Sequence, residues 1–403
     1  MRIWIVSELY YPEDISTGYY VTGIAETLAR EFPVRVLCGH PKGGSALGET
    51  KSSELHSGVF ITRCGGTRWN ANILLLRIIN ALSLSLGIFL RALLEFRKND
   101  CVIVVTNPPF LPILIAIACA VRSSRSILLV HDVYPDVLCA VGILDRKSPL
   151  VACLIAVSRL VLRAVSEIIV LGRDMREHFH RLCPGADSKT RIIPNWADVD
   201  EIRPTPREMN GVIARHSFGA RFLVQYSGNM GRTHGVEEVV EAARLLADRD
   251  DIHFVLIGHG AKKDWVAKAV EQLKNVTLLP YVPRASLNES LNACDISLIA
   301  FRPGMVGLSV PSRMYNVMAA GKPILAVAED QSELSRVVEE EQIGWTVSPR
   351  NPSQIAEVIV QAKEHPELLQ AMGLRARKAA ETKYSRKDVL RTYSALVRES
   401  SRS

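Results

Sequence analysis

The sequence predicts two α/β domains, each with a Rossmann-like parallel sheet covered by helices on both faces. Two observations carry this prediction. Short apolar strands alternate with helical stretches along the chain, and the alternation restarts after a polar segment that contains prolines. The length of 403 residues also agrees with two domains. We therefore expect a first domain at residues 1–195, a second at residues 196–380, and a C-terminal helix at residues 381–403 that packs back on the first domain.

The first half begins with a strand that we expect to be buried. Arg2 to Ser7 is almost continuously apolar, as parallel strands are when helices cover both faces. A polar loop around Pro12 to Gly18 separates this strand from a helix at Tyr19 to Phe32, where apolar residues recur at helical spacing. The other strands expected in this half are Val34–Cys38, Val102–Thr106, Ser126–Val130, Glu167–Leu171 and Arg191–Pro194.

The second half repeats this order after a polar linker at Asn195 to Met209. A strand at Arg221 to Tyr226 leads through a glycine-rich turn into a helix at Val236 to Ala247, and Pro366 to Arg398 reads as a long helical region. Further strands are expected at His253–Ile257, Val276–Leu279, Ile296–Ala300 and Pro323–Ala326. Ligands bind beyond the carboxyl ends of such strands, so we expect the two domains to face each other across a ligand-binding cleft.

The net charge of +7 is concentrated in the first half. Residues 60–130 carry eight basic side chains but only Glu95 and Asp100 as acids. A basic surface suits nucleic acid, anionic lipid or phosphorylated substrates, and it can also be a solvated face without a partner. Aromatic residues make up only 6% of the chain and no nucleic-acid recognition motif is present, so we expect no nucleic-acid partner.

Cysteine usage and the apolar segments bear on the compartment. None of the eight cysteines forms a CxxC pair, and several lie in apolar runs, which favours buried thiols in a reducing cytoplasm. Met1 to Leu9 has neither the basic start nor the cleavage site of a signal peptide.

In Ala71 to Leu94, the uncharged run between Arg77 and Arg91 is too short to span a bilayer. This segment is either an amphipathic helix on the inner membrane face or two helices packed on the sheet.

A glycine-rich turn, Tyr226 to Gly235, follows a strand and precedes a helix. Glycines let the backbone approach a ligand closely, and the start of a helix attracts phosphate. Arg232 and His234 add side-chain donors. The alternative is a plain turn whose glycines serve packing.

A second candidate segment, Phe301 to Pro323, follows the strand that ends at Ala300. We expect Ser312 to cap a helix that Gly321 ends. The polar side chains available there for a diphosphate and a ribose are Arg302, Arg313 and Asn316.

The second segment reads Gly-Leu-Ser-Val-Pro-Ser-Arg-Met-Tyr-Asn at residues 307–316. It resembles the donor-binding signature of the retaining GT-B glycosyltransferases of family 4, in the subgroup of bacterial colanic-acid and O-antigen fucosamine transferases. Other segments resemble motifs of this subgroup in the same order along the chain, from residue 10 to residue 385: Val130–Asp136, Pro194–Trp196 and Gly228–Gly231.

The resemblance implies a transferase that moves a sugar, with retention, from a nucleotide diphosphate sugar, which we expect to be UDP-linked. The acceptor it implies is a glycan or a polyprenyl-diphosphate-linked glycan of a cell-surface polysaccharide. No cofactor is expected beyond this co-substrate. No metal is expected either, since Asp198-Val199-Asp200 matches a DxD motif but lies in the linker. Rival functions are a nucleotide-sugar epimerase of the same build and a non-catalytic partner in a glycan assembly complex.

Site residues carry over from the resemblance one by one. His131 and Arg313 are the catalytic candidates, with His131 beside the transferred sugar. The acceptor candidates are Gly18, Asp132 and Asp136. The donor candidates are Gly228, Asn229, Gly231, Arg232, Arg302, Ser309, Val310, Ser312, Arg313 and Asn316. A structural histidine and ordinary loop carboxylates are the alternatives in the first domain.

The chain also departs from the family pattern. Family members often have two glutamates where this chain has Leu308 and Asn316. Asn229 and His234 stand where an arginine and a lysine are common. Neutralisation of the diphosphate is therefore expected to depend on Arg232, Arg302 or Arg313.

Overall fold

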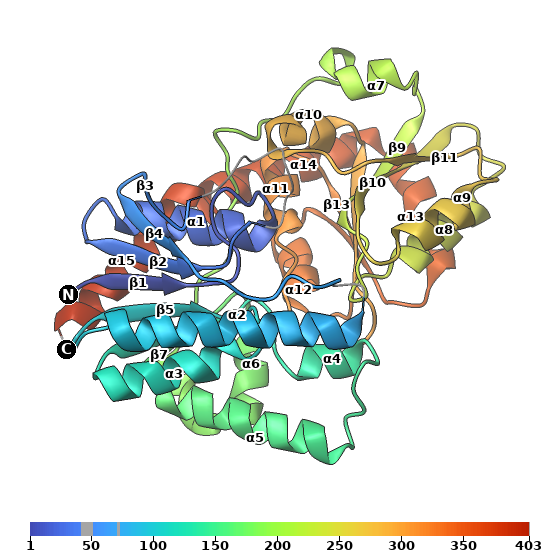
Figure 1. Cartoon of the computed structure of the whole chain (residues 1–403). Helices are drawn as coiled ribbons and strands as arrows, with labels where there is room; N and C mark the ends of the chain where they lie inside the picture. The colour runs from blue at the N-terminus through green and yellow to red at the C-terminus, as the bar shows by residue number, and fades with distance from the viewer. Residues whose placement is uncertain (42–50, 71–72, 403) are drawn as a thin grey trace. The chain divides into compact units, whose positions relative to one another are not determined.

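The computed structural model describes residues 1–41, 51–70 and 73–402. The chain divides into two compact units, each built around one sheet (Figure 1). The first unit comprises Met1–Pro194 together with Gly307–Ser309 and Val389–Ser403. The second comprises Asn195–Val306 and Val310–Asp388. Both units have the alternating α/β order that the sequence predicts.

The sheet of the first unit has eight strands in the order β3-β4-β2-β1-β5-β6-β7-β8. All neighbouring strands are parallel except the pair β3 and β4. The strands are β1 (Ile3–Val6), β2 (Val34–Cys38), β3 (Ser53–His56), β4 (Val59–Arg63), β5 (Cys101–Val105), β6 (Arg125–Leu129), β7 (Glu167–Val170) and β8 (Thr190–Ile192). The six strands expected in this half are confirmed to within one or two residues at each end, and the hairpin β3–β4 was missed.

Helices cover both faces of this sheet, with α2 and α3 on the face opposite α1 and α15 (Figure 1). The helices are α1 (Ser16–Leu28), α2 (Leu74–Glu95), α3 (Leu111–Arg122), α4 (Asp136–Ala140), α5 (Pro149–Ala164), α6 (Arg173–Leu182) and α15 (Arg386–Arg402). The chain leaves β1 for β2 and leaves β5 for β6 in opposite directions, so the carboxyl ends of β1 and β5 mark the topological switch point of the sheet.

Two expectations for the first unit need correction. The polar loop expected to reach Gly18 ends earlier, because Gly18 lies in the first turn of α1, where a Cβ would come within 2.6 Å of the Glu13 carbonyl oxygen. The apolar segment at 71–94 does not form two helices, since α2 is continuous over 22 residues. By length and composition alone, α2 is apolar enough to cross a membrane from Leu75 to Glu95.

The sheet of the second unit has six parallel strands in the order β11-β10-β9-β12-β13-β14. They are β9 (Phe222–Asn229), β10 (Ile252–His259), β11 (Val276–Leu279), β12 (Ile296–Ala300), β13 (Ile324–Val327) and β14 (Gly344–Val347). Five were expected, and β14 was missed. β9 runs further than predicted because Gly228, with φ of 140°, stays paired with Gly258. A Cβ on Gly258 would overlap the Gly228 carbonyl oxygen.

The helices of this unit are α7 (Gly211–Arg215), α8 (Val236–Leu245), α9 (Lys263–Val270), α10 (Leu287–Asn292), α11 (Arg313–Ala319), α12 (Glu333–Glu340), α13 (Pro352–Glu364) and α14 (Pro366–Thr382). The helical region expected at 366–398 is two helices, because the chain breaks between α14 and α15. At the break, the Ala197 amide donates to the Tyr384 carbonyl at 2.7 Å, and Arg386 donates to the Asp198 carboxylate at 3.1 Å. Asp198 of the DxD sequence therefore anchors the start of α15.

All eight cysteines are free thiols. Six are buried, Cys139 is half-buried, and Cys153 is exposed on α5. Burial raises the pKa of Cys101 and of Cys294 to about 12, so these thiols stay protonated at neutral pH. They pack as small apolar side chains, as the sequence predicts for most of the cysteines.

Candidate functional site

The glycine turn of the second unit is shaped around Arg313. A Cβ at Gly228 would lie 3.0 Å from Cζ of Arg313, so only glycine leaves this guanidinium its place against the backbone. Arg313 donates from Nη1 to the Ser227 carbonyl at 3.2 Å and from Nη2 to the Tyr226 hydroxyl at 3.4 Å. The Tyr226 hydroxyl in turn donates to the Asn229 carbonyl at 2.7 Å. The predicted donor-binding residues Gly228, Asn229 and Arg313 therefore lie together in this turn.

The loop between β10 and α9 packs on this turn. A Cβ at Gly260 would clash with the Asn229 side chain. The Met230 amide donates to the His259 carbonyl at 2.7 Å, and the Lys262 amide donates to the Met230 carbonyl at 2.9 Å. Both loops follow the carboxyl ends of neighbouring strands, which is where parallel sheets bind ligands.

Lys262 is a candidate binding residue that the sequence reasoning missed. Its Nζ donates to the His234 carbonyl at 2.6 Å and pairs with Glu237 at 2.7 Å. Burial lowers the pKa of Lys262, and the positive charges of Arg302 and Arg232 lower it further. The predicted residues Arg232 and Arg302 therefore lie within electrostatic range of Lys262. The sequence offers one signal for Lys262: a second pair of glycines, Gly258 and Gly260, lies shortly before it.

His234 is half-buried in the same turn. Burial lowers its pKa well below the usual value, and the charges of Arg313 and Lys262 add to this effect. Its Nδ1 lies 3.1 Å from the Thr233 hydroxyl. A neutral imidazole results, so His234 can exchange a hydrogen bond with a ligand but adds no positive charge for a diphosphate.

The start of α11 differs from the expectation. Ser312 precedes the helix but has helical φ and ψ, and its side chain makes no capping hydrogen bond to the helix, so the predicted cap is wrong. Gly321 follows the last residues of the helix with φ of 63°, as predicted for its end. Asn316 is half-buried on α11, and its Oδ1 has no hydrogen-bond partner among the described residues. A buried acceptor without a partner costs free energy that a ligand hydroxyl can recover.

The segment Gly307–Ser309 belongs to the first unit. The Gly307 amide donates to the Asp174 carboxylate at 3.0 Å, and the Val133 amide donates to the Leu308 carbonyl at 3.0 Å. Ser309 forms an isolated bridge with Asp132. Leu308, where the family often has glutamate, is buried and 5% exposed, and the next candidate, Val310, is also buried.

His131 follows β6 and is buried. Its amide donates to the Thr106 hydroxyl at 3.1 Å, and burial lowers the pKa of its side chain to about 4. The ring is therefore neutral at physiological pH. Its Nε2 is buried and has no hydrogen-bond partner among the described residues, as is also true of the Asn316 oxygen. Both atoms are candidates for contacts with ligand hydroxyls.

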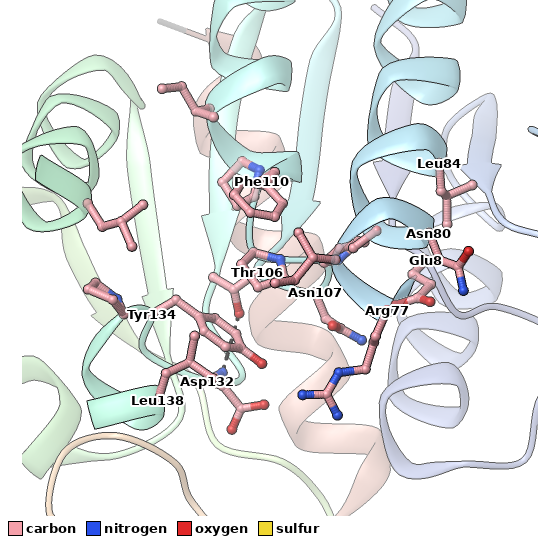
Figure 2. A pocket seen from close by; sticks show the side chains of 18 of the residues that line it. Glu8, Arg77, Asn80, Leu84, Thr106, Asn107, Phe110, Asp132, Tyr134 and Leu138 are labelled. Carbon is pink, nitrogen blue, oxygen red and sulfur yellow. Dashed lines mark hydrogen bonds between the residues drawn. The ribbon is translucent and has the colours of Figure 1, made fainter. Parts of the chain in front are cut away.

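Asp132 lines a cavity of about 970 Å³ in the first unit, whose walls come from the strand ends and from α2, α3, α4 and α5. Figure 2 shows the Asp132 carboxylate near Thr106, which accepts a hydrogen bond from the Asp132 amide at 3.3 Å. Burial raises the pKa of Asp132, and the hydrogen bond with Ser309 partly offsets this. Burial also raises the pKa of Tyr134, on which the charges of Asp132 and Arg77 act as well.

Asp136, the other predicted acceptor carboxylate, does not line this cavity. It pairs with Arg146 at 2.9 Å and lies 3.8 Å from Nε2 of His178. Burial favours its neutral form, but His178 and Arg146 outweigh burial and lower the pKa of Asp136. Its position in an ion pair at the start of α4 favours a structural role.

The second unit therefore offers a glycine-lined turn surrounded by positive charge, at the strand ends of a parallel sheet. The first unit offers a large cavity with a carboxylate, also at its strand ends. This combination agrees with the nucleotide-sugar glycosyltransferase of the GT-B fold that the sequence predicts, and the comparisons that follow show this class.

Comparisons with known proteins specify the family. Residues 214–379 match the family model "Glycosyl transferases group 1", and residues 17–196 match "Glycosyl transferase 4-like domain". The chain is 32% identical over 404 residues to the probable glycosyltransferase WbjE of Pseudomonas aeruginosa, covering 98% of each protein. It is 24% identical to the putative colanic acid biosynthesis glycosyl transferase WcaI of Escherichia coli, again over 98% of each. The chain belongs to the group 1 glycosyltransferases of family 4.

Solved structures support the fold. Sucrose-phosphate synthase from Thermosynechococcus elongatus superposes with a TM-score of 0.79 at 15% identity, over 99% of both chains. HepE from Anabaena, in complex with UDP and glucose, superposes with a TM-score of 0.76 at 15% identity, over 99% of this chain and 100% of that chain. The GT-B fold expected from the sequence is confirmed.

Proposed function

We propose that the protein transfers a sugar from a UDP-linked donor to a polyprenyl-diphosphate-linked glycan, with retention, in the synthesis of a cell-surface polysaccharide. The observation that carries the donor side is the positively charged turn formed by Gly228, Arg232, Lys262, Arg302 and Arg313. The HepE structures with UDP and with UDP-glucose support a UDP-linked donor. The name of the relative WcaI supports polysaccharide synthesis.

The chemistry breaks the bond between the anomeric carbon of the sugar and the diphosphate. An acceptor hydroxyl bonds to that carbon and passes its proton to the departing diphosphate. Negative charge develops on the departing UDP. Fixed positive charges around it stabilise the transition state more than the ground state. Arg313 serves this role because its contacts to Ser227 and Tyr226 hold it in one orientation. The neutral ring of His131 exchanges a hydrogen bond with a sugar hydroxyl.

The proposed lipid-linked acceptor requires contact with a membrane, and α2 supports it. Its outer side carries an exposed apolar row at helical spacing: Leu75, Ile78, Leu82, Leu86, Leu90 and Leu94. Asn80 and Ser83 on its other side bond to Thr67 within the unit, at 2.9 and 2.8 Å. We therefore propose that α2 lies on the cytoplasmic face of the membrane, with Arg77 and Arg91 near lipid phosphates, instead of spanning the bilayer.

Titration of the full-length protein with UDP, GDP and ADP tests the donor. We expect UDP to bind most tightly and Arg313→Ala to weaken it. Arg249→Ala is the matched control, because Arg249 precedes the amino end of β10, whereas the turn at Gly228 lies at the carboxyl end of the neighbouring strand β9. UDP release from a panel of UDP-sugars, with and without a polyprenyl-diphosphate glycan, then tests the reaction. No binding of any nucleotide would contradict the proposal.

Sedimentation with phosphatidylglycerol vesicles tests the membrane contact. Leu82→Glu and Leu86→Glu should each reduce the vesicle-bound fraction several-fold, because they place a charge in the apolar row. Leu245→Glu, at an exposed leucine on α8 of the second unit, should leave binding unchanged. Equal sedimentation of all these variants and the unmodified protein would refute a role for α2.

A further inference from the structure

The cavity of the first unit has two chemically different ends. Its polar end lies at the switch point of the sheet, where Glu8 follows β1 and Asn107 follows β5 (Figure 2). Other polar side chains of this end are His40, Arg68, Arg77 and Asp132. Apolar side chains of α3, α4 and α5 line the rest of the cavity: Ile113, Leu154, Val157 and Val161, together with Leu138, which lies beside Asp132 in Figure 2. A compound that fills the whole cavity must itself be polar at one end and apolar at the other.

The size of the cavity indicates a ligand site. The volume of about 970 Å³ lies at the upper end of the range of small-molecule sites, roughly 300–1,000 Å³. An apolar cavity of this size gains stability when hydrocarbon fills it.

The apolar lining continues onto the outer surface of the unit. Ile78 lines the cavity and is also 38% exposed as a member of the apolar row on α2. Leu150 lines the cavity from the start of α5 and is 57% exposed. Ile78 and Leu150 therefore belong both to the exposed apolar surface and to the cavity lining, and Arg77 lies next to Ile78.

The polar end fits a phosphate group. Arg77 reaches it from α2, and Arg68 reaches it from the segment after β4 (Figure 2 shows Arg77). Arginine side chains pair with phosphate oxygens through several N–H groups. Asn80 also lies at this end, where its amide is hydrogen-bonded to Thr67 and Trp69. Asp132 lies beside them, so a hydroxyl-bearing group next to the phosphate would meet a carboxylate that can accept its hydrogen bond.

We propose that this cavity binds the lipid part of the acceptor, with the isoprenoid units nearest the diphosphate among α3, α4 and α5 and the diphosphate at Arg68 and Arg77. This inference rests on the proposed function and adds a defined binding site to it. Hydrocarbon and phosphate together select the ligand, so the site should distinguish a lipid-linked acceptor from a free glycan.

Calorimetric titration with farnesyl diphosphate tests the site, because this probe has both chemical parts and no sugar. We expect it to bind the full-length protein at least ten times more tightly than inorganic pyrophosphate does. Val157→Trp should weaken farnesyl diphosphate binding at least ten-fold by filling the apolar end. Leu160→Trp is the matched control, since Leu160 is 60% exposed on the same helix and does not line the cavity. It should bind as the unmodified protein does.

Arg77→Ala provides a second variant in case the tryptophan disturbs folding, because Arg77 is exposed and its loss leaves the core intact. It should weaken farnesyl diphosphate while leaving UDP affinity in the second unit unchanged. Equal affinity for pyrophosphate and farnesyl diphosphate, or equal affinity of Val157→Trp and Leu160→Trp, would overturn the proposal. Tighter binding of dodecyl phosphate than of farnesyl diphosphate would assign the cavity to an acyl lipid and overturn it too. Failure of UDP titration would instead count against the proposed function.

Discussion

The guanidinium carbon of Arg313 lies 4.7 Å from the centre of the Tyr226 ring. Arg313 begins α11 and Tyr226 lies in β9, so this contact joins two segments that are far apart in the sequence. A cation over an aromatic face is attracted by the ring electrons. The two hydrogen bonds of Arg313 to Ser227 and Tyr226 fix the orientation of the planar group and leave its other N–H groups for a ligand.

Arg313→Ala should reduce turnover by on the order of 100-fold, the usual cost of losing one preorganised donor to a developing negative charge. Arg313→Lys should retain more activity than the alanine variant, since the charge remains while the planar stacking on Tyr226 is lost. Steady-state kinetics with a UDP-sugar measure both effects. Unchanged turnover in Arg313→Ala would remove Arg313 from the catalytic residues.

Gly228→Ala should destabilise the second unit and weaken UDP binding together. The backbone φ of 140° is unfavourable for any residue with a Cβ, at a cost of about 1–3 kcal/mol. The new Cβ would also press on Arg313 at 3.0 Å. Thermal unfolding and UDP titration measure the two effects. Gly185→Ala is the control, because a Cβ there meets nothing within 4 Å and φ is not positive.

Local patterns predicted the strands well where burial is uniform. Val276–Leu279 and Ile296–Ala300 form β11 and β12 at the expected residues. The strand β3 was missed because three of its four residues are polar and it lies at the sheet edge, where no apolar run is needed. β9 is also longer than predicted, because a glycine in the sequence does not show that Gly228 continues the pairing with Gly258.

The site was predictable only in part for a related reason. Glycines and arginines near strand ends identified the turn around Gly228 and the place of Arg313. Lys262 comes to the turn through the register of two neighbouring strands, and register is not visible in one sequence. The ion pair of Asp136 was not predictable either, because its partners Arg146 and His178 come from other segments of the chain. The cavity requires the packing of four helices, which periodicity alone does not define.

Asn316→Leu should weaken UDP binding by about two- to ten-fold and leave thermal stability unchanged or slightly raised. The Oδ1 atom of Asn316 has no partner within the described part of the chain, so leucine removes an unsatisfied polar atom from the folded protein. In the complex it removes an acceptor for a ligand hydroxyl, worth about 0.5–1.5 kcal/mol. UDP titration and thermal unfolding of the same samples separate the effects. A lower Tm with unchanged UDP affinity would assign Asn316 to the fold instead.

His131 should make the first unit sensitive to acid. Burial lowers its pKa to about 4, whereas a solvated imidazole titrates near 6.5. Between these two pH values the unfolded chain binds a proton at this residue and the folded chain does not. Lowering the pH from 6.5 toward 4 therefore favours unfolding, by about 3 kcal/mol for this one site when the range is complete, and the stability is fully present above pH 6.5.

His131→Gln removes this titration and tests the prediction. Thermal unfolding at pH 7.5 and at pH 5 should show a smaller loss of Tm on acidification for the variant than for the unmodified protein. His253 provides a comparison in the second unit, because burial lowers its pKa to about 4 as well. His253→Gln should reduce the loss of thermal stability on acidification in the second unit and leave this loss unchanged in the first unit. An identical loss of Tm on acidification in His131→Gln and the unmodified protein would mean that water reaches the His131 ring and that the ring titrates normally. This result would also weaken the case for a sugar hydroxyl as its partner.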